Sequence, residues 1–370
     1  DDPRYATIRQ VVGQGSDDFL SAIDTPSSPQ REALCWLTYF DPLEVETTDQ
    51  DHLIQRYSLA VLAYALLDVE TGDSRLLAPS SNEINAWLSR AHECQWIDVT
   101  CDRAYERKVE EVWMYEGKAR GTIPAELRSL TLLESFDVRD NDISGSFPDF
   151  LWTMTTLKAL DLSENKFSGS MSESISALSD LVIFVINDNR DMTGTIPIGL
   201  TALPVLDTLD LSTCGLNGTI PTEIGLLGEV KAMSLEKNSL SGTLPTEIGI
   251  LQQMSHLRLG FNSLDDSTLP TELGNLASVR LLDLASGRFA GPIPSELGRL
   301  SRLSDSLILL ENSFTGTIPT QLGRLDRAYA MRFEDNDGLT GSMPAEICNL
   351  RTTGGGELEI LTVACVLGDP

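Results

Sequence analysis

Three histidines, six cysteines and 55 acidic residues are the side chains of this 370-residue chain with the potential for chemistry. The histidines, His52, His92 and His256, lie far apart in the sequence and match no metal-ligand spacing. No G-x-S-x-G nucleophile motif is present, and the TGGG stretch at 353–356 lacks the lysine and the strand-to-helix setting of a phosphate loop. The sequence therefore predicts no catalytic residues, no enzyme and no firm metal or cofactor site.

The acidic residues outnumber the 27 basic ones, and the formal net charge is −28. A surface of this sign repels nucleic acids and anionic lipids, so we exclude both as partners. It favours cationic partners or divalent ions, although solubility alone also accounts for it.

The longest apolar run, 58–67, has half the length of a membrane span, so we expect no span in this chain. The chain begins with Asp1 rather than Met, from which we expect a processed product whose leader is not visible here.

Four of the cysteines form two pairs that bracket the middle of the chain. Cys94 and Cys101 stand close together, and Cys348 and Cys365 enclose the last segment. Pairs at the two ends of a long region predict disulfides and an oxidising compartment. We expect the other two, Cys35 and Cys214, to be packed inside as free thiols.

An apolar residue followed by Pro recurs through the central region. Successive occurrences are 24 or 25 residues apart and define ten units, a period typical of solenoids. The prolines are Pro124, Pro148, Pro197, Pro221, Pro245, Pro270, Pro294, Pro319 and Pro344, with Ser172 in place of one.

Each unit carries the pattern L-x-x-L-x-L-x-x-N-x-L-x-G, in which L-x-L predicts a short strand with alternate residues inward. We expect the Asn amide to bond backbone groups of its own and neighbouring units that would otherwise be buried unpaired. The predicted ladder is Asn141, Asn165, Asn189, Asn238, Asn262, Asn312 and Asn336, interrupted at Cys214 and Gly287.

The G-x-I-P insert after this pattern resembles plant-type leucine-rich repeats (LRRs) over residues 109–347. The resemblance implies an α/β, right-handed LRR solenoid of about ten repeats of 24–25 residues with disulfide-stapled caps. The stretch Trp87 to Cys101 is similar to the N-terminal cap of extracellular proteins of this class, with Asp98 in place of the usual Gly. The helical stretch before the cap resembles secreted or cell-surface LRR proteins of diatoms and related algae.

We accordingly divide the chain into four regions. Residues 1–50 form a partly extended segment with a short helix, and residues 51–104 form a helical cap containing an amphipathic helix at 52–67. Residues 105–347 form the solenoid, and residues 348–370 form the C-terminal cap.

Repeat proteins bind on the face that their strands present, because it is broad and rigid. The predicted ligand-binding residues on this concave face are Trp113, Tyr115, Asp137, Arg139, Asp161, Val185, Asp210, Arg258, Phe261, Ile308, Leu310 and Arg332. Within this set, Ile308 and Leu310 are expected to be exposed and to form an apolar contact patch. Asp137, Asp140, Asp161 and Glu164 cluster closely enough to hold Ca²⁺, or form a solvated acidic face.

Two further surface features lie beside the recurring Gly of the units. A rank of Thr and Ser residues, broken at Pro292, has the spacing of an ice-binding surface, although strand propensity and bonds between units also explain it. Asn217 starts the one N-x-S/T glycosylation site.

We therefore expect a secreted or cell-surface recognition or adhesion module, receptor-like in type, that binds an extracellular protein, peptide or polysaccharide. One alternative is an inhibitor of cell-wall-degrading enzymes similar to the polygalacturonase-inhibiting proteins, which share this repeat and cap. Another is an ice-active or extracellular-matrix structural protein.

Overall fold

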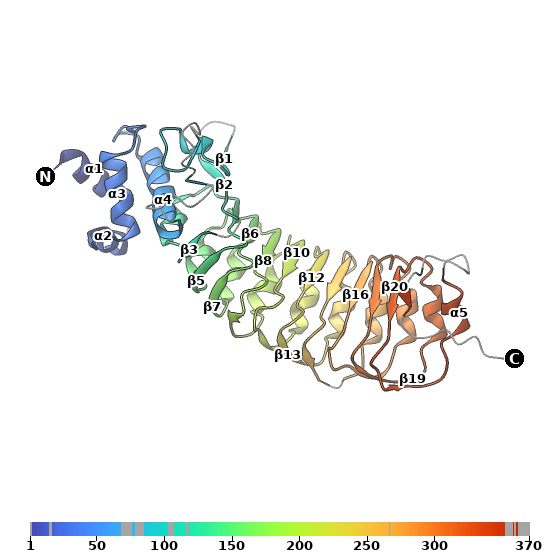
Figure 1. The fold of residues 1–370 in the computed structure, drawn as a ribbon. Helices are drawn as coiled ribbons and strands as arrows, with labels where there is room; N and C mark the ends of the chain where they lie inside the picture. Colours follow the sequence, from blue (N-terminus) through green and yellow to red (C-terminus); the bar gives the residue numbers. More distant parts are fainter. Residues whose placement is uncertain are drawn as a thin grey trace. The chain divides into compact units, whose positions relative to one another are not determined.

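The computed structural model describes residues 2–14, 17–67, 76–77, 85–102, 107–115, 118–265, 267–351, 358 and 360–361. These residues form two compact units, residues 1–168 and 169–370, whose elements are labelled in Figure 1. The fold class predicted from the repeats is confirmed in both units. The boundaries expected at residues 50, 104 and 347 stay predictions.

Four helices open the first unit, each begun by residues suited to a helix N-terminus. Asp2, Ser28 and Asp49 accept backbone N–H bonds at the starts of three of them, and proline follows in the first two. The helices are α1 (Pro3–Val12), α2 (Asp17–Asp24), α3 (Pro29–Tyr39) and α4 (Gln50–Leu66).

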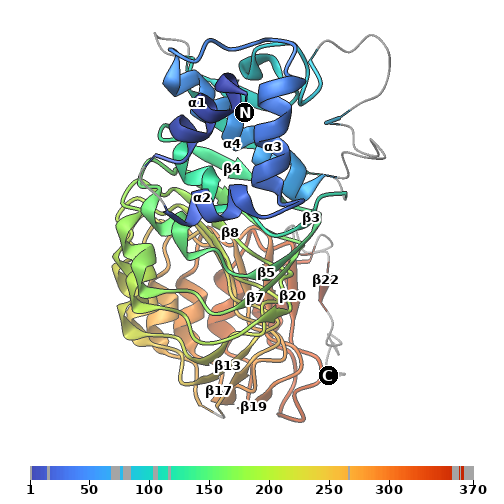
Figure 2. The same cartoon turned by 90° about the vertical axis from the view of Figure 1, so that its left-hand side faces the viewer.

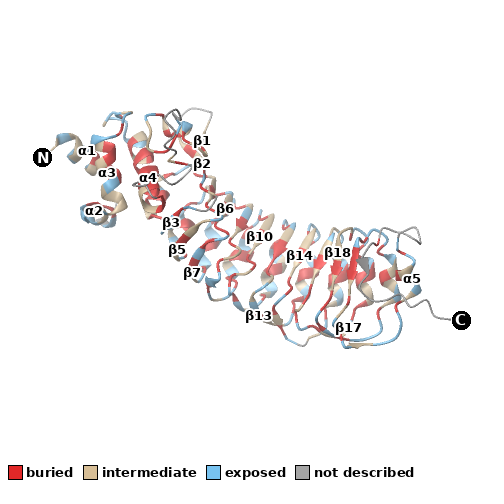
Figure 3. Cartoon of the chain, in the orientation of Figure 1, coloured by how far each residue is buried: buried red, intermediate tan, exposed pale blue. Residues whose placement is uncertain are grey.

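Helix α4 confirms the helix predicted at 52–67 but is not amphipathic. Its polar residues Gln55, Arg56 and Ser58 are buried together with its apolar ones, because α3, the cap and the first repeats pack around it. The buried residues of α4 are visible in Figure 3.

Arg56 is a fully buried cation at the centre of this helical region. Its guanidinium carbon lies 5.1 Å from the ring centroid of Trp36 and 4.9 Å from that of Trp96. Asp41, also fully buried, accepts two hydrogen bonds from it, of 2.9 and 2.7 Å. Its charge is thus balanced by a bidentate partner and flanked by two aromatic rings.

The remaining N–H groups of Arg56 bind the cap. They donate to the carbonyl oxygens of Ala91 and Ser89, at 2.9 and 2.6 Å, and to the Glu93 carboxylate at 3.2 Å. All five guanidinium donors therefore have acceptors, which a buried charge requires.

The predicted disulfide between Cys94 and Cys101 is confirmed, with an S–S length of 2.01 Å. It joins η1 (Glu93–Gln95) to β1 (Val99–Cys101), which pairs antiparallel with β2 (Val109–Trp113). Cys348 is disulfide-bonded, and its predicted partner Cys365 lies outside the described residues.

Cys35 and Cys214 are free thiols, as expected. Cys214 is buried, but Cys35 is half-exposed, and the expectation that it is packed inside is wrong. The buried face of α3 is formed instead by its neighbours Ala33, Leu34 and Leu37.

The repeats of the first unit follow the cap. Three parallel strands, β2, β4 (Ser135–Asp137) and β6 (Ala159–Asp161), pair side by side. A second row and the intervening 3₁₀ turns complete each repeat: β3 (Arg120–Gly121), β5 (Asp142–Ser146), β7 (Lys166–Gly169), η2 (Ala125–Ser129) and η3 (Asp149–Thr153).

The second unit repeats this arrangement seven times. Its parallel strands are β8 (Ile183–Val185), β10 (Thr208–Asp210), β12 (Ala232–Ser234), β14 (His256–Arg258), β16 (Leu281–Asp283), β18 (Ser306–Ile308) and β20 (Ala330–Arg332), followed by β22 (Ile360–Leu361).

Shorter strands form the second row of this unit: β9 (Asp191–Met192), β11 (Asn217–Thr219), β13 (Ser239–Gly242), β15 (Ser263–Leu264), β17 (Ala290–Pro292), β19 (Ser313–Gly316) and β21 (Gly338–Leu339). The third side holds η4 (Glu173–Ala177), η5 (Ile198–Ala202), η6 (Thr222–Leu226), η7 (Thr246–Ile250), η8 (Thr271–Asn275), η9 (Ser295–Arg299), η10 (Thr320–Arg324) and the helix α5 (Ala345–Cys348). In Figure 2 these turns lie on the opposite side of the unit from strands β8 to β20.

The predicted asparagine ladder joins consecutive repeats. The Asn262 amide nitrogen contacts the carbonyls of Leu259 and Gly260 in its own repeat and that of Leu235 in the preceding one, at 2.9, 3.3 and 2.9 Å. Its side-chain oxygen accepts the Leu240 N–H at 3.1 Å. Corresponding bonds to the preceding repeat are made by Asn141, Asn165, Asn238, Asn312 and Asn336.

Cys214 takes the asparagine position in one repeat. Its sulfur lies 3.1 Å from the Ile186 carbonyl oxygen and 3.3 Å from that of Ser212, so a single S–H serves where an amide would make several bonds. Burial raises the pKa of this thiol to about 12, and it stays protonated as a donor.

We expect Asn262→Ala to lower the free energy of unfolding by about 3 kcal/mol, because it leaves buried carbonyls and one N–H without partners. Asn275→Ala, which truncates an exposed asparagine at the end of η8, is the matched control and should change it by less than about 0.5 kcal/mol. Urea unfolding of both variants measures the difference. Equal effects would contradict the framework role.

Candidate ligand-binding face

The strand face consists of the outward side chains of the parallel strands, on β2, β4 and β6 in the first unit and on β8 to β20 in the second. In each three-residue strand the middle residue points inward and is buried, as Phe136, Leu209 and Leu257 are, and Val112 is their equivalent in the longer β2. The residues on either side of it point outward, and parallel pairing sets equivalent ones about 4.8 Å apart.

One row of the strand face runs across the whole second unit. Strand register places Val185, Asp210, Ser234, Arg258, Asp283, Ile308 and Arg332 side by side in that order. All are partly exposed except Ser234, which is buried. The five predicted residues among them are thus brought into one line, which mixes apolar, acidic and basic side chains.

The first unit brings together five other predicted residues. Register aligns Trp113, Asp137 and Asp161 on neighbouring strands. An Nη of Arg139 lies 3.5 Å from a carboxylate oxygen of Asp137 and 3.7 Å from one of Asp161, and its guanidinium carbon is 5.4 Å from the Tyr115 ring centroid. Trp113 remains 37% exposed beside them.

The aspartates of this row also serve the framework. One oxygen of Asp137 accepts the Arg139 N–H at 3.1 Å, and one oxygen of Asp161 accepts the N–H and hydroxyl of Ser163 at 3.0 and 2.5 Å. Asp210 makes the same pair of bonds to Ser212. The pKa of Asp137 is raised, because the effect of its burial is larger than the opposite effect of the hydrogen bond that it accepts from the Arg139 N–H.

The four acids expected to hold Ca²⁺ do not gather into one ligand set. Arg139 occupies the space between Asp137 and Asp161, while Asp140 and Glu164 stand at the turns that follow the strands. In the described part of the chain, the acidic, histidine and cysteine side chains that do gather into a group of three belong to the cap. Calcium binding on this face stays a prediction without a geometric argument.

The later half of the row is electrostatically mixed. Burial raises the pKa of Asp283, while its Ala285 N–H bond and the positive charges of Arg258 and Arg332 lower it. Phe261, 46% exposed, stands beside the row with the Lys237 ammonium 6.0 Å from its ring centroid. An aromatic ring and alternating charges therefore occupy adjacent repeats.

Leu310 corrects one prediction. The residue is 7% exposed, so it does not form an exposed patch with Ile308. In the same column Ser212 and Ala285 are also buried, whereas Arg139 is exposed. A position in this column therefore does not by itself place a side chain on the exposed face.

The turn that ends each strand is left-handed, a backbone conformation that the sequence pattern did not predict. The residue before each ladder position has a positive φ, a conformation that costs a non-glycine residue about 1–2 kcal/mol. These residues are Asp140, Glu164, Asp188, Thr213, Lys237, Phe261, Ser286, Glu311 and Asp335. Their position directly before the asparagine is the sequence signal by which the edge of the strand face can be found.

The rank of hydroxyls lies at the ends of the second row of strands or just after them, and all its members are exposed. A Cβ added at Gly218 would lie 2.7 Å from the Thr195 methyl, and one at Gly242 would lie 2.8 Å from the Thr219 methyl. Each threonine therefore packs against the glycine of the next repeat, whose φ is positive. Packing between repeats accounts for this rank. Asn217, the predicted glycosylation site, is exposed on the same row.

A protein-family model described as Leucine Rich Repeat matches residues 156–178 and 205–227. The chain folds as a leucine-rich repeat solenoid. The matched segments carry the strand, the ladder position and the 3₁₀ turn of two repeats; the first segment spans the boundary at residues 168 and 169, and the second lies within the second unit.

Among solved structures, the LRR solenoid is similar to plant receptor ectodomains. It is 26% identical to that of GASSHO1/SCHENGEN3 from Arabidopsis thaliana, in complex with CASPARIAN STRIP INTEGRITY FACTOR 2, over 80% of this chain and 38% of that one, with a TM-score of 0.69. It is 26% identical to the Arabidopsis receptor kinase HAESA, in complex with the peptide hormone IDA and the co-receptor SERK1, over 82% of this chain and 44% of that one, with a TM-score of 0.57. The chain spans less than half of each.

A plant ice-binding protein shares the fold, at 20% identity and a TM-score of 0.66, over 85% of this chain and 98% of that one. A search of curated proteins found no match. In the described part of the LRR solenoid and its cap, every helix is too short or too polar to cross a membrane.

Leu310→Ala is expected to lower the free energy of unfolding by about 2–4 kcal/mol, because it empties buried volume. Ile308→Ala, two residues away on the half-exposed row, should change it by less than about 1 kcal/mol. Thermal and urea unfolding compare the two variants. A larger loss for Ile308→Ala would show that the assignment of the two columns is wrong.

Proposed function

We propose that this LRR solenoid is a non-catalytic extracellular recognition module that binds a peptide or an exposed protein segment along its strand face. The observation that carries the proposal is the row from Val185 to Arg332, in which side chains of different chemistry stand at one-strand intervals on a rigid sheet. A ligand lying across the strands meets a different residue in each repeat, which supports sequence-specific binding.

The receptor ectodomains with the same fold support this class of ligand. HAESA, a receptor kinase, is in complex with a peptide hormone. GASSHO1/SCHENGEN3 is a plant membrane receptor kinase, and its LRR ectodomain is in complex with CASPARIAN STRIP INTEGRITY FACTOR 2. The disulfide between Cys94 and Cys101 fits an oxidising, extracellular setting.

The composition of the row indicates the ligand. Basic residues Arg258 and Arg332 enclose Asp283 and Ile308, with Phe261 at the edge. A peptide with an acidic residue, an apolar residue and an aromatic or basic residue would complement them. The rank of hydroxyls has a packing explanation, so ice binding is not proposed, and polysaccharide binding is an outcome of the test.

The test is selection of binders to the whole chain from a displayed library of random 15-residue peptides, beside a glycan array. Captured peptides should bind the double variant Arg258→Glu/Arg332→Glu at least tenfold more weakly. The same reversal at Arg299 and Arg324, exposed on the 3₁₀ turns, is the control and should leave affinity unchanged.

Capture of peptides whose binding depends on Arg299 and Arg324 instead would overturn the strand-face assignment. Capture of glycans alone, sensitive to Trp113→Ala, would replace a peptide ligand with a polysaccharide.

A further inference from the structure

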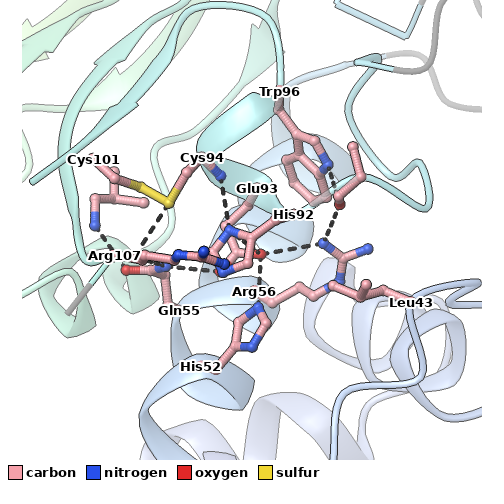
Figure 4. Close-up of polar contacts among 12 residues, drawn as sticks. Leu43, His52, Gln55, Arg56, His92, Glu93, Cys94, Trp96, Cys101 and Arg107 are labelled. Atoms are coloured by element: carbon pink, nitrogen blue, oxygen red, sulfur yellow. Dashed lines mark hydrogen bonds and ion pairs between the residues drawn. A yellow bond between two sulfur atoms is a disulfide. The ribbon is translucent and has the colours of Figure 1, made fainter. Parts of the chain in front are cut away.

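Two of the three histidines, 40 positions apart in the sequence, meet in the N-terminal cap. The rings of His52, on α4, and His92, just before η1, are stacked with centroids 4.4 Å apart and planes 20° from parallel. Between them and the protein interior lies Glu93, whose side chain is fully buried. Figure 4 shows the three side chains converging beside the disulfide.

Three donor atoms of this group face one another. Nε2 of His52 lies 3.0 Å and Nδ1 of His92 lies 3.7 Å from the same carboxylate oxygen, Oε2, of Glu93. Zinc–nitrogen bonds of 2.0–2.1 Å place tetrahedral ligand atoms about 3.3 Å apart. The observed separations lie on either side of this value, and all the donor atoms are within 4.8 Å of one another.

The surroundings hold the donors in place and leave an approach from solvent. Gln55 donates to the other oxygen of Glu93 at 2.7 Å, and a carboxylate oxygen of Asp49 lies 3.7 Å from the second nitrogen of His52. A pocket of about 510 Å³ opens beside the group and is lined by His52, His92, Asp49 and Asp51 among others.

The charges around the group are mixed. Asp49 and Asp51 line the pocket together with Arg107 and Lys108, and the Lys108 ammonium lies 3.7 Å from a carboxylate oxygen of Asp51. The geometry of the donor atoms, rather than the net charge, is therefore what favours a metal ion here.

We propose that His52, His92 and Glu93 bind one divalent transition-metal ion of the zinc class, with water from the pocket as a fourth ligand. Two imidazoles and one carboxylate are a donor set that suits Zn²⁺. The Cys94 N–H now donates to Nδ1 of His92 at 3.2 Å. When the ion binds, the lone pair of this nitrogen coordinates the metal instead, and the Cys94 N–H donates to a water molecule. The ion would join α4 to the disulfide-bonded cap, a structural role separate from ligand binding on the strand face.

The test titrates Zn²⁺ into the whole, metal-free chain by calorimetry. We expect one ion per chain, affinity at least tenfold weaker in His52→Gln and in His92→Gln, and unchanged affinity in His256→Gln. His256 is the matched control, because it lies on β14 of the second unit, beside Asp305, whereas the cap belongs to the first unit.

A second measurement needs no variant in the cap. Histidine ¹⁵N signals of the native chain should shift with Zn²⁺ for two of the three rings, and Co²⁺ should give the intense visible bands of a four-coordinate site. Absence of binding, dependence on His256, or bands of a six-coordinate aquo ion would each overturn the proposal.

Discussion

Each repeat of this solenoid depends on the pairing of backbone groups that its own chain segment cannot satisfy. A three-residue strand followed by a left-handed turn leaves carbonyls facing the interior, and one asparagine amide contacts carbonyls of two successive repeats. Because such groups cost about 1–3 kcal/mol when buried unpaired, the ladder fixes the stacking distance and the register of the strands. As a consequence, the side chains of the strand face do not have to pair buried backbone groups, and the ladder holds them at a regular spacing.

The departures from the ladder show how strict the requirement is. Cys214 can replace the asparagine because its buried, protonated thiol still donates to a carbonyl oxygen. The residue before the ladder position has a positive φ even where it is a long or bulky side chain, as at Lys237 and Phe261. Local strain is thus tolerated in every repeat, since relieving it would break the bonds between repeats.

Much of this fold could be read from periodicity, because each repeated residue has the same task in every unit. The 24–25-residue spacing, the ladder and the Cys94–Cys101 pair were all predictable, as were most positions of the row. Leu310 was not, because alternation does not reveal where the strand ends. The group of His52, His92 and Glu93 was also missed: its members share no motif, and only the packing of α4 against the cap brings them together. The amphipathic character predicted for α4 was wrong for the same reason, because residues distant in sequence bury its polar side chain Arg56.

The central claim is that ligands bind the strand face while the 3₁₀ turns remain free. Hydroxyl-radical footprinting of the chain with and without a captured peptide tests it directly, because both surfaces carry exposed apolar side chains. Phe261 and Ile308 stand on or beside the row, whereas Leu226 and Ile250 on the turns are 68% and 63% exposed. The account predicts that oxidation of Phe261 and Ile308 falls when peptide is bound and that of Leu226 and Ile250 does not. Protection of the turn residues, with Phe261 and Ile308 unchanged, would contradict it.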